Sequence, residues 1–122
     1  IIVDDESLLK KISWFHQWIA MVKDVSLGIL VCFDLTKDLA GGFLPQDCAA
    51  ATQNLLLAAH DAWLWTVWTG IYPQKEIMDQ FISLFDLPEH IIPFSFVPIW
   101  YPADAGKAGN RFKQDKIHIN QW

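Results

Sequence analysis

The sequence has few cysteines, few basic residues and no long hydrophobic run. Its two cysteines, Cys32 and Cys48, cannot form a disulfide framework, and both lie in apolar segments. We therefore expect buried free thiols in a reducing, cytoplasmic compartment, with a disulfide or a redox role as the alternative. With a net charge of -5, the chain lacks the basic surface that a nucleic-acid-binding protein normally carries.

Other kinds of site are missing as well. No run of about 18 apolar residues predicts a membrane span. No spacing of His, Cys, Asp and Glu indicates a metal site, and Gly41-Gly42 lacks the further glycines and the lysine of a phosphate-binding loop. We therefore predict no metal, no nucleic acid and no membrane partner, and we assign no catalytic residue.

What the chain does have is apolar surface. Hydrophobic residues make up 52% of its 122 residues, and aromatic residues 14%, with seven Trp among them. This is apolar-rich for one domain of this size, and it indicates a subunit interface or a missing segment. We expect a single domain over residues 1–122 that begins within strand-like sequence, so that something upstream is absent.

Hydrophobic periodicity predicts alternating strands and helices. Strands are expected at Ile1–Val3, Leu27–Phe33, Trp65–Ile71 and Ile91–Tyr101, with a strand-like run at Ile117–Trp122. Helices are expected from Asp5 or Ser7 to Phe15, over residues 18–22, from Pro45 to Ala62 and from Pro73 to Phe85. The order predicts an α+β domain with helices covering a sheet. Pro93 and Pro98 should restrict the last long strand to an edge position or to bulges.

The helix Asp47–Ala62 is the most informative segment. A predicted apolar stripe consists of Cys48, Ala51, Leu55, Ala58 or Ala59, and Ala62. Leu57 and its neighbours extend the apolar surface around the other side. A helix that is apolar on most sides is buried on several sides, and small residues allow a partner to approach closely.

Three motifs resemble those of the nitroreductase-like family of FMN-dependent oxidoreductases. They are ILVCFD at residues 29–34, QDCAAATQNLLLAAH followed by VWTGIYP within residues 46–73, and LPEHIIPFSFVPIWYP at residues 87–102. The resemblance covers roughly residues 1–111. It implies a nitroreductase-like core, with a mostly antiparallel sheet of about four strands, N-terminally truncated relative to the family.

The resemblance also implies a function. Family members are homodimers that pack through the equivalent of the Asp47–Ala62 helix, with FMN at the subunit interface. The flavin passes hydride from NAD(P)H to a small aromatic acceptor, a nitroaromatic or a quinone, while the protein orients it.

The same resemblance assigns candidate cofactor-binding residues. Thr69 and Gly70 match the turn whose backbone approaches the isoalloxazine ring, where a side chain on Gly70 would block close approach. Arg111 matches a basic residue that contacts the FMN phosphate, and Lys107 and Lys113 are further candidates for that contact.

Four large aromatic residues stand where the family pattern has glycine: Phe33, Trp63, Trp65 and Trp100. Glycine at a helix C-terminus serves a left-handed conformation, which Trp63 would tolerate poorly. We expect the four side chains to fill space together, with Trp65 and Trp100 close to each other in the sheet.

Alternatives remain open at this stage. Trp63, Trp65, Trp68 and Trp100 could form a stacking platform for a planar ligand or simply pack in the core. The alternative function is a non-catalytic, engineered or truncated derivative of the same fold, its flavin pocket filled by aromatics. A small aromatic-ligand binder is a third interpretation.

Overall fold

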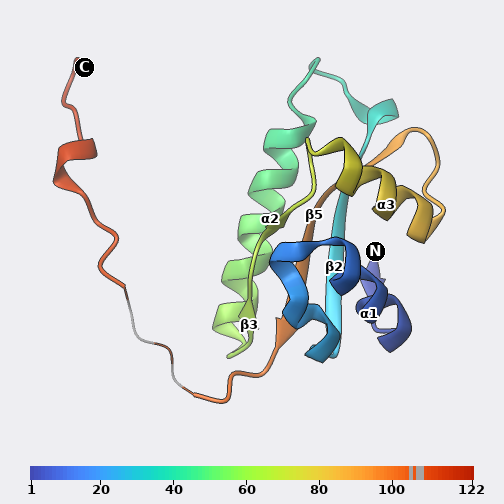
Figure 1. Cartoon of the computed structure of the whole chain (residues 1–122). Helices are drawn as coiled ribbons and strands as arrows, with labels where there is room; N and C mark the ends of the chain where they lie inside the picture. The colour runs from blue at the N-terminus through green and yellow to red at the C-terminus, as the bar shows by residue number, and fades with distance from the viewer. Residues whose placement is uncertain (105, 107–108) are drawn as a thin grey trace.

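The computed structural model describes residues 1–104, 106 and 109–122 (Figure 1). Its helices are α1 (Glu6–Phe15), α2 (Leu44–Asp61) and α3 (Lys75–Phe85), with 3₁₀ segments η1 (Gln17–Asp24), η2 (Leu35–Lys37) and η3 (Gln114–Lys116). Its strands are β1 (Ile2–Val3), β2 (Leu27–Asp34), β3 (Trp65–Thr66), β4 (Thr69–Gly70) and β5 (Ile91–Trp100). The predicted α+β fold is therefore confirmed.

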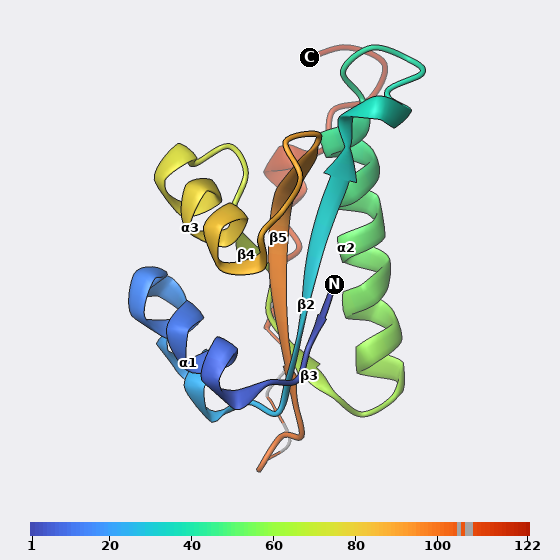
Figure 2. The same ribbon diagram turned by 90° about the vertical axis from the view of Figure 1, so that its right-hand side faces the viewer.

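The strands form one antiparallel sheet of five strands in the order β1-β2-β5-β3, with β4 also paired to β5. Helix α2 covers one face of the sheet, and α1, η1 and α3 cover the other (Figure 2). The sheet is antiparallel as expected and has one strand more than the predicted four, because the third predicted strand is divided in two.

Helix α1 begins where the sequence predicts. The Asp5 carboxylate accepts hydrogen bonds from the backbone N–H groups of Ser7 (2.7 Å) and Leu8 (3.1 Å), which satisfies N–H groups that the first helical turn leaves free. These hydrogen bonds, the Ser7 hydroxyl first, lower the pKa of Asp5. Leu9 and Ile12 then face the core.

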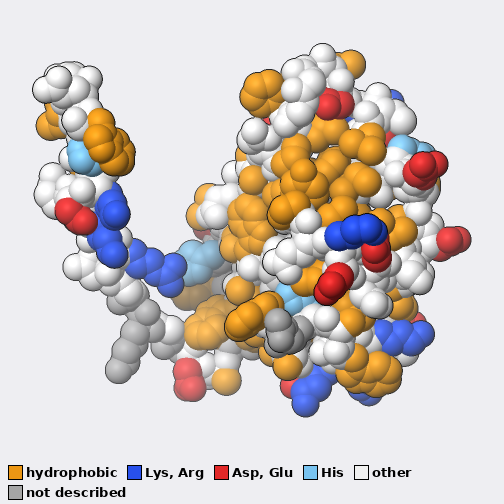
Figure 3. Space-filling model, turned by 45° about the horizontal axis from the view of Figure 1, so that its top comes forward, with side chains coloured by type: hydrophobic (Ala, Val, Ile, Leu, Met, Phe, Trp, Pro, Cys, Tyr) orange, Lys and Arg blue, Asp and Glu red, His pale blue; other side chains and the backbone are white. Residues whose placement is uncertain are grey.

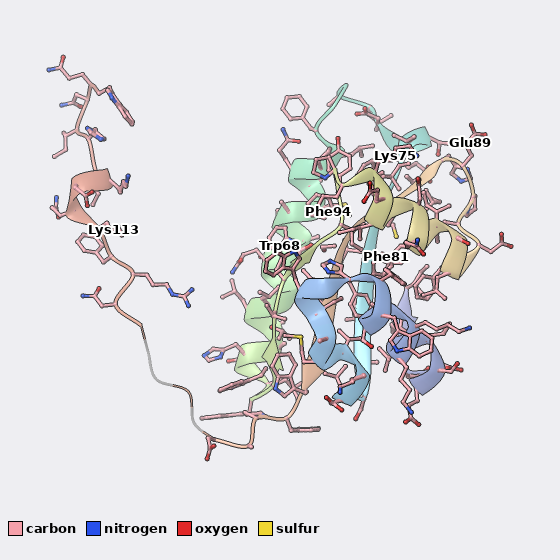
Figure 4. All side chains as sticks on the ribbon, viewed as in Figure 1. Trp68, Lys75, Phe81, Glu89, Phe94 and Lys113 are labelled. Carbon is pink, nitrogen blue, oxygen red and sulfur yellow. The ribbon has the colours of Figure 1, made fainter. Side chains whose placement is uncertain are left out.

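The core between the sheet and this helical layer is centred on Phe81 of α3 (Figure 4). Its ring lies 5.2 Å from the ring of Phe15 on α1, edge to face, and 5.8 Å from the ring of Phe96 on β5. One side chain of α3 thus ties both helices to the central strand.

The sequence predicts that Pro93 and Pro98 restrict this strand to an edge position or to bulges, and because β5 lies inside the sheet, the bulge is the alternative that holds. The predicted bulge does occur: Val31 pairs with Ser95 but Cys32 pairs with Pro93, so Phe94 has no partner on β2. On the other side, the registers place Pro98 opposite Val67, between β3 and β4. Proline cannot donate a ladder hydrogen bond, and the two irregularities lie beside Pro93, at Phe94, and at Pro98 on the side facing Val67.

This break also corrects the predicted strand Trp65–Ile71. The chain instead forms the two short strands β3 and β4, separated by Val67 and Trp68.

The strand-like run predicted at Ile117–Trp122 is wrong. Residues 109–122 are exposed, contain only the short η3 and run away from the body of the molecule (Figure 1). A strand needs a hydrogen-bonded neighbour, and no pairing involves this part of the described chain.

Helix α2 buries one face rather than several. Cys48, Thr52 and Ala59 face the sheet, whereas Ala51 and Ala62 of the predicted stripe are exposed. Thr52 is buried because its polar group is satisfied: the hydroxyl donates to the Cys48 carbonyl (2.7 Å) and lies 2.9 Å from Ser95 Oγ. The opposite face remains open to solvent in the single chain, with Leu57 59% exposed.

We predict that Gly28→Ala destabilises the fold. A Cβ at position 28 would lie 2.1 Å from Cζ of Phe96, whose ring is fully buried and cannot move aside freely. Such overpacking costs about 1–3 kcal/mol of unfolding free energy, measured by urea denaturation. Gly70→Ala is the matched control, because a Cβ there meets nothing within 4 Å. Equal midpoints for the two variants would contradict the prediction.

Candidate functional site

The predicted residues Thr69 and Gly70 form β4, at the edge of the sheet beside the centre of β5. Thr69 pairs with Phe96 and Gly70 with Ser95. Thr69 is buried, and its hydroxyl donates to the Phe96 carbonyl at 2.5 Å. Threonine is thus fixed by its side chain, whereas its neighbour Gly70 is exposed.

Nothing in the part of the chain that the structure describes requires glycine at position 70. Its φ is not in the left-handed region, unlike that of Gly41 and Gly42, and a Cβ built on it would meet nothing within 4 Å. Ile71 N–H donates to the Phe94 carbonyl (3.0 Å), so by the alternation of an antiparallel ladder the N–H and C=O of Gly70 point away from β5. Gly70 therefore leaves open space beside an outward-facing peptide.

The bulge in β5 shapes the turn that follows Gly70. The carbonyl of the bulge residue Phe94 accepts hydrogen bonds from both Ile71 N–H and Tyr72 N–H, each at 3.0 Å. The Tyr72 ring stacks on the Phe94 ring at a centroid distance of 6.2 Å. One irregularity in the central strand thus holds the backbone of the candidate site.

An aromatic cluster of Phe33, Trp68, Tyr72 and Phe94 surrounds this turn. Trp68 and Phe94 lie beside each other near the upper part of α2 (Figure 4), with ring centroids 5.9 Å apart. Phe33 contacts Tyr72 edge to face at 5.5 Å. Sequence reasoning missed Tyr72 and Phe94 as site residues, although Tyr72 belongs to the VWTGIYP motif.

The basic candidates are separate from β4 in this structure. Arg111 and Lys113 are exposed in the segment 109–122, and Lys113 lies well away from the body of the molecule (Figure 4). Lys107 lies outside the described residues. The chain therefore brings Thr69 and Gly70 together but does not bring Arg111 to them.

The four aromatic residues at glycine positions do not form one cluster, so that hypothesis is wrong. Trp65 and Trp100 do pair across the sheet as predicted, edge to face, with centroids 6.4 Å apart. Phe33 pairs with Ile92, at the opposite end of β5 from Trp100, and Trp63 is 86% exposed. The length of β5 keeps Phe33 apart from Trp100, so the four side chains cannot fill one space together. Of the predicted stacking platform, Trp63 and Trp65 line one pocket and Trp65 contacts Trp100, whereas Trp68 packs against Phe94 instead.

Both thiols are free, as predicted. Burial raises the pKa of Cys32 to about 11 and also raises the pKa of Cys48. A thiol is nucleophilic or metal-binding as the thiolate, so neither cysteine is prepared for such chemistry. In the described part of the chain no group of His, Cys, Asp and Glu could hold a metal ion, and no helix is long and apolar enough to cross a membrane.

The molecule is thus an α+β domain whose candidate site is an open, glycine-bearing edge strand. Its sequence is 43% identical to a "Putative NADH dehydrogenase/NAD(P)H nitroreductase" of Methanothermobacter thermautotrophicus, covering the whole chain and 64% of that relative. It is 39% identical to a protein of the same name from Archaeoglobus fulgidus, covering 72% of it. The chain belongs to the nitroreductase family. No family model matches it.

Solved structures agree. A crystal structure with the same name from Bacteroides thetaiotaomicron has a TM-score of 0.94 and 32% identity, covering the whole chain and 71% of that protein. An "FMN-dependent Nitroreductase" from Clostridium difficile has a TM-score of 0.89 at 21% identity, covering the whole chain and 74% of that protein, and shows the shared fold. The chain spans less than two thirds of the length of the Methanothermobacter relative.

Trp63, directly after α2, has the left-handed conformation that its position predicts, with φ of 59°. Its side chain is too exposed for packing to offset the strain of a bulky residue there.

We predict that Trp63→Gly stabilises the protein by about 1 kcal/mol, because glycine adopts this conformation without steric cost. Trp63→Ala is the matched control, since it removes the same indole but keeps a Cβ. Thermal unfolding of both variants separates the backbone effect from loss of the side chain. Equal melting temperatures would show that the left-handed conformation carries no strain.

Proposed function

We propose that this chain is the core of an FMN-dependent oxidoreductase of nitroreductase type, which transfers hydride from NAD(P)H to a nitroaromatic or a quinone. Its family membership supports an NAD(P)H-linked oxidoreductase as the general kind of reaction. A fold neighbour described as an FMN-dependent nitroreductase supports FMN as the cofactor.

The single observation that carries the proposal is the open space at Gly70. A planar ring can approach Gly70 closely on the side where a Cβ would stand, because a Cβ built there meets nothing within 4 Å in the described part of the chain. The outward-facing Gly70 N–H is a hydrogen-bond donor for such a ring. Thr69, held by its hydroxyl bond to Phe96, and the Phe94 carbonyl fix the backbone on either side of it.

These residues fit FMN in this respect. FMN, when bound, would supply the hydride chemistry. The chain would orient it through the Thr69–Gly70 backbone, and the half-exposed Tyr72 and the aromatic cluster beneath it would exclude water from one side. We assign no proton-transferring residue.

Basic residues of the C-terminal segment would bind the FMN phosphate. Arg111 is the preferred candidate, because its guanidinium can bind a phosphate with two parallel hydrogen bonds, and Lys107 is a second candidate. Since Arg111 lies apart from β4 in the structure described above, this contact requires the segment to lie against a flavin site of the assembled protein.

The proposed assembly is a homodimer through the Asp47–Ala62 helix. The outer face of α2 is free in the single chain, and Leu57 on it is largely exposed. A broad area of hydrophobic side chains on the body of the molecule is seen in Figure 3. Exposed apolar surface is typical of interfaces, and the choice of α2 for the dimer rests on the family resemblance and on the exposed Leu57.

The decisive experiment is a titration of the purified chain with FMN, followed by flavin fluorescence and by native mass. We expect quenching of the flavin, a yellow protein and the mass of a dimer. NAD(P)H oxidation with a nitroaromatic or a quinone then tests the reaction. Colourless protein that leaves FMN fluorescence unchanged would instead support the non-catalytic derivative of the fold.

We predict that Gly70→Ala weakens FMN binding by at least about tenfold, since a methyl group would project into the space the ring needs, and 1.4 kcal/mol corresponds to tenfold. The unfolding midpoint of the flavin-free protein should not fall, because that methyl meets no protein atom. Unchanged affinity for FMN would place the flavin elsewhere.

We predict that Arg111→Gln weakens binding of FMN by about tenfold or more but leaves riboflavin binding unchanged, because riboflavin lacks the phosphate. Lys116→Gln, at another exposed lysine of the same segment that is not a candidate for the phosphate contact, is the control and should have a smaller effect. An equal loss for both flavins would show that Arg111 does not contact the phosphate.

A further inference from the structure

One buried polar side chain of the helical layer contacts the backbone of the candidate site. His16 lies at the joint between α1 and η1 and is only 2% exposed. Its Nε2 lies 3.1 Å from the carbonyl oxygen of Gly70, across a sequence separation of 54 residues. Its Nδ1 is buried and has no hydrogen-bond partner among the residues that the structure describes.

The chemistry of this contact fixes the state of the ring. A carbonyl oxygen can only accept, so Nε2 must carry the hydrogen and donate it. A hydrogen on Nδ1 as well would leave a buried donor with no acceptor, which is costly. The contact with the Gly70 carbonyl therefore places the donated hydrogen on Nε2.

The contact restrains a peptide that is otherwise held from one side. The peptide between Gly70 and Ile71 donates through Ile71 N–H to Phe94 on β5 and accepts through the Gly70 carbonyl from His16 on the opposite side. Glycine has the greatest backbone freedom of any residue, and the exposed Gly70 has no side chain that could pack to limit it. The hydrogen bond from His16 to the Gly70 carbonyl limits that freedom.

We propose that His16 is a positioning residue of the flavin site, which sets the orientation of the Gly70 peptide from the helical layer on the other side of β4. Its effect on FMN rests on the function proposed above. His16 does not touch the cofactor itself, and it acts only through Gly70.

The hydrogen bond is tested first on the flavin-free protein. Nitrogen NMR of the imidazole should report hydrogen on Nε2 of His16, and the hydrogen on Nδ1 would overturn the proposal. His16→Asn carries its amide too close to the backbone to reach Gly70, whereas His16→Gln places an N–H donor near the position of Nε2. We expect about tenfold faster hydrogen exchange of the Ile71 amide in His16→Asn and near-normal exchange in His16→Gln.

FMN affinity is measured next, well below the unfolding temperature of each variant. His16→Asn should bind FMN about tenfold more weakly than the unmodified protein, with affinity restored in His16→Gln. His90→Asn, at an exposed histidine, is the matched control and should change neither quantity. Equal affinity and equal Ile71 exchange in the two His16 variants would overturn the proposal.

The two failures are distinguishable. An unmodified protein that does not bind FMN overturns the proposed function, and the exchange of the Ile71 amide then decides by itself whether His16 positions the Gly70 peptide. If His16→Asn does not fold, the tautomer of the unmodified protein and the exchange in His16→Gln still decide the point.

Discussion

The structure depends on the pairing of β5 along both of its edges. β2 pairs with it on one side, and β3 and β4 pair with it on the other. Its Phe96 contacts Phe81 of α3 and lies over Gly28 of β2, so the helical layer, both neighbouring strands and the core meet on one element. A strand paired on both sides is the most constrained part of a sheet, and the candidate site lies against it.

The two prolines of β5 lack N–H groups for the ladder, and the strand pairing is irregular beside each of them. In an ordinary central strand each missing N–H would cost a ladder hydrogen bond. Here the bulge at Phe94 leaves a carbonyl that accepts from both Ile71 and Tyr72, and the gap opposite Pro98 separates β3 from β4. The irregular pairing therefore gives β4 its short length and gives the turn after Gly70 its shape.

The site couples this irregular strand to the helical layer through few polar contacts. His16 binds the outward carbonyl of Gly70, and Thr69 binds the carbonyl of Phe96. Burial raises the pKa of both thiols, so Cys32 and Cys48 are not activated as nucleophiles. The described site thus offers an ordered backbone and no activated thiol. Such a site suits the proposed function, in which a bound cofactor supplies the chemistry and the backbone orients it.

The sequence by itself determined the elements that local physics controls. The cap at Asp5, the amphipathic helices α1 and α3 and the apolar strands β2 and β5 follow from residue types at short spacing. The left-handed position at Trp63 and the Thr69–Gly70 turn were instead implied by the resemblance to the family.

Only the tertiary structure decided which of these elements meet. It placed β5 in the centre of the sheet despite its prolines and separated Phe33 from Trp100 along that strand. It left the Ile117–Trp122 run without a pairing partner among the described residues. It also brought His16 to Gly70. Contacts between residues far apart in the chain depend on register and layer order, which no short stretch of sequence encodes.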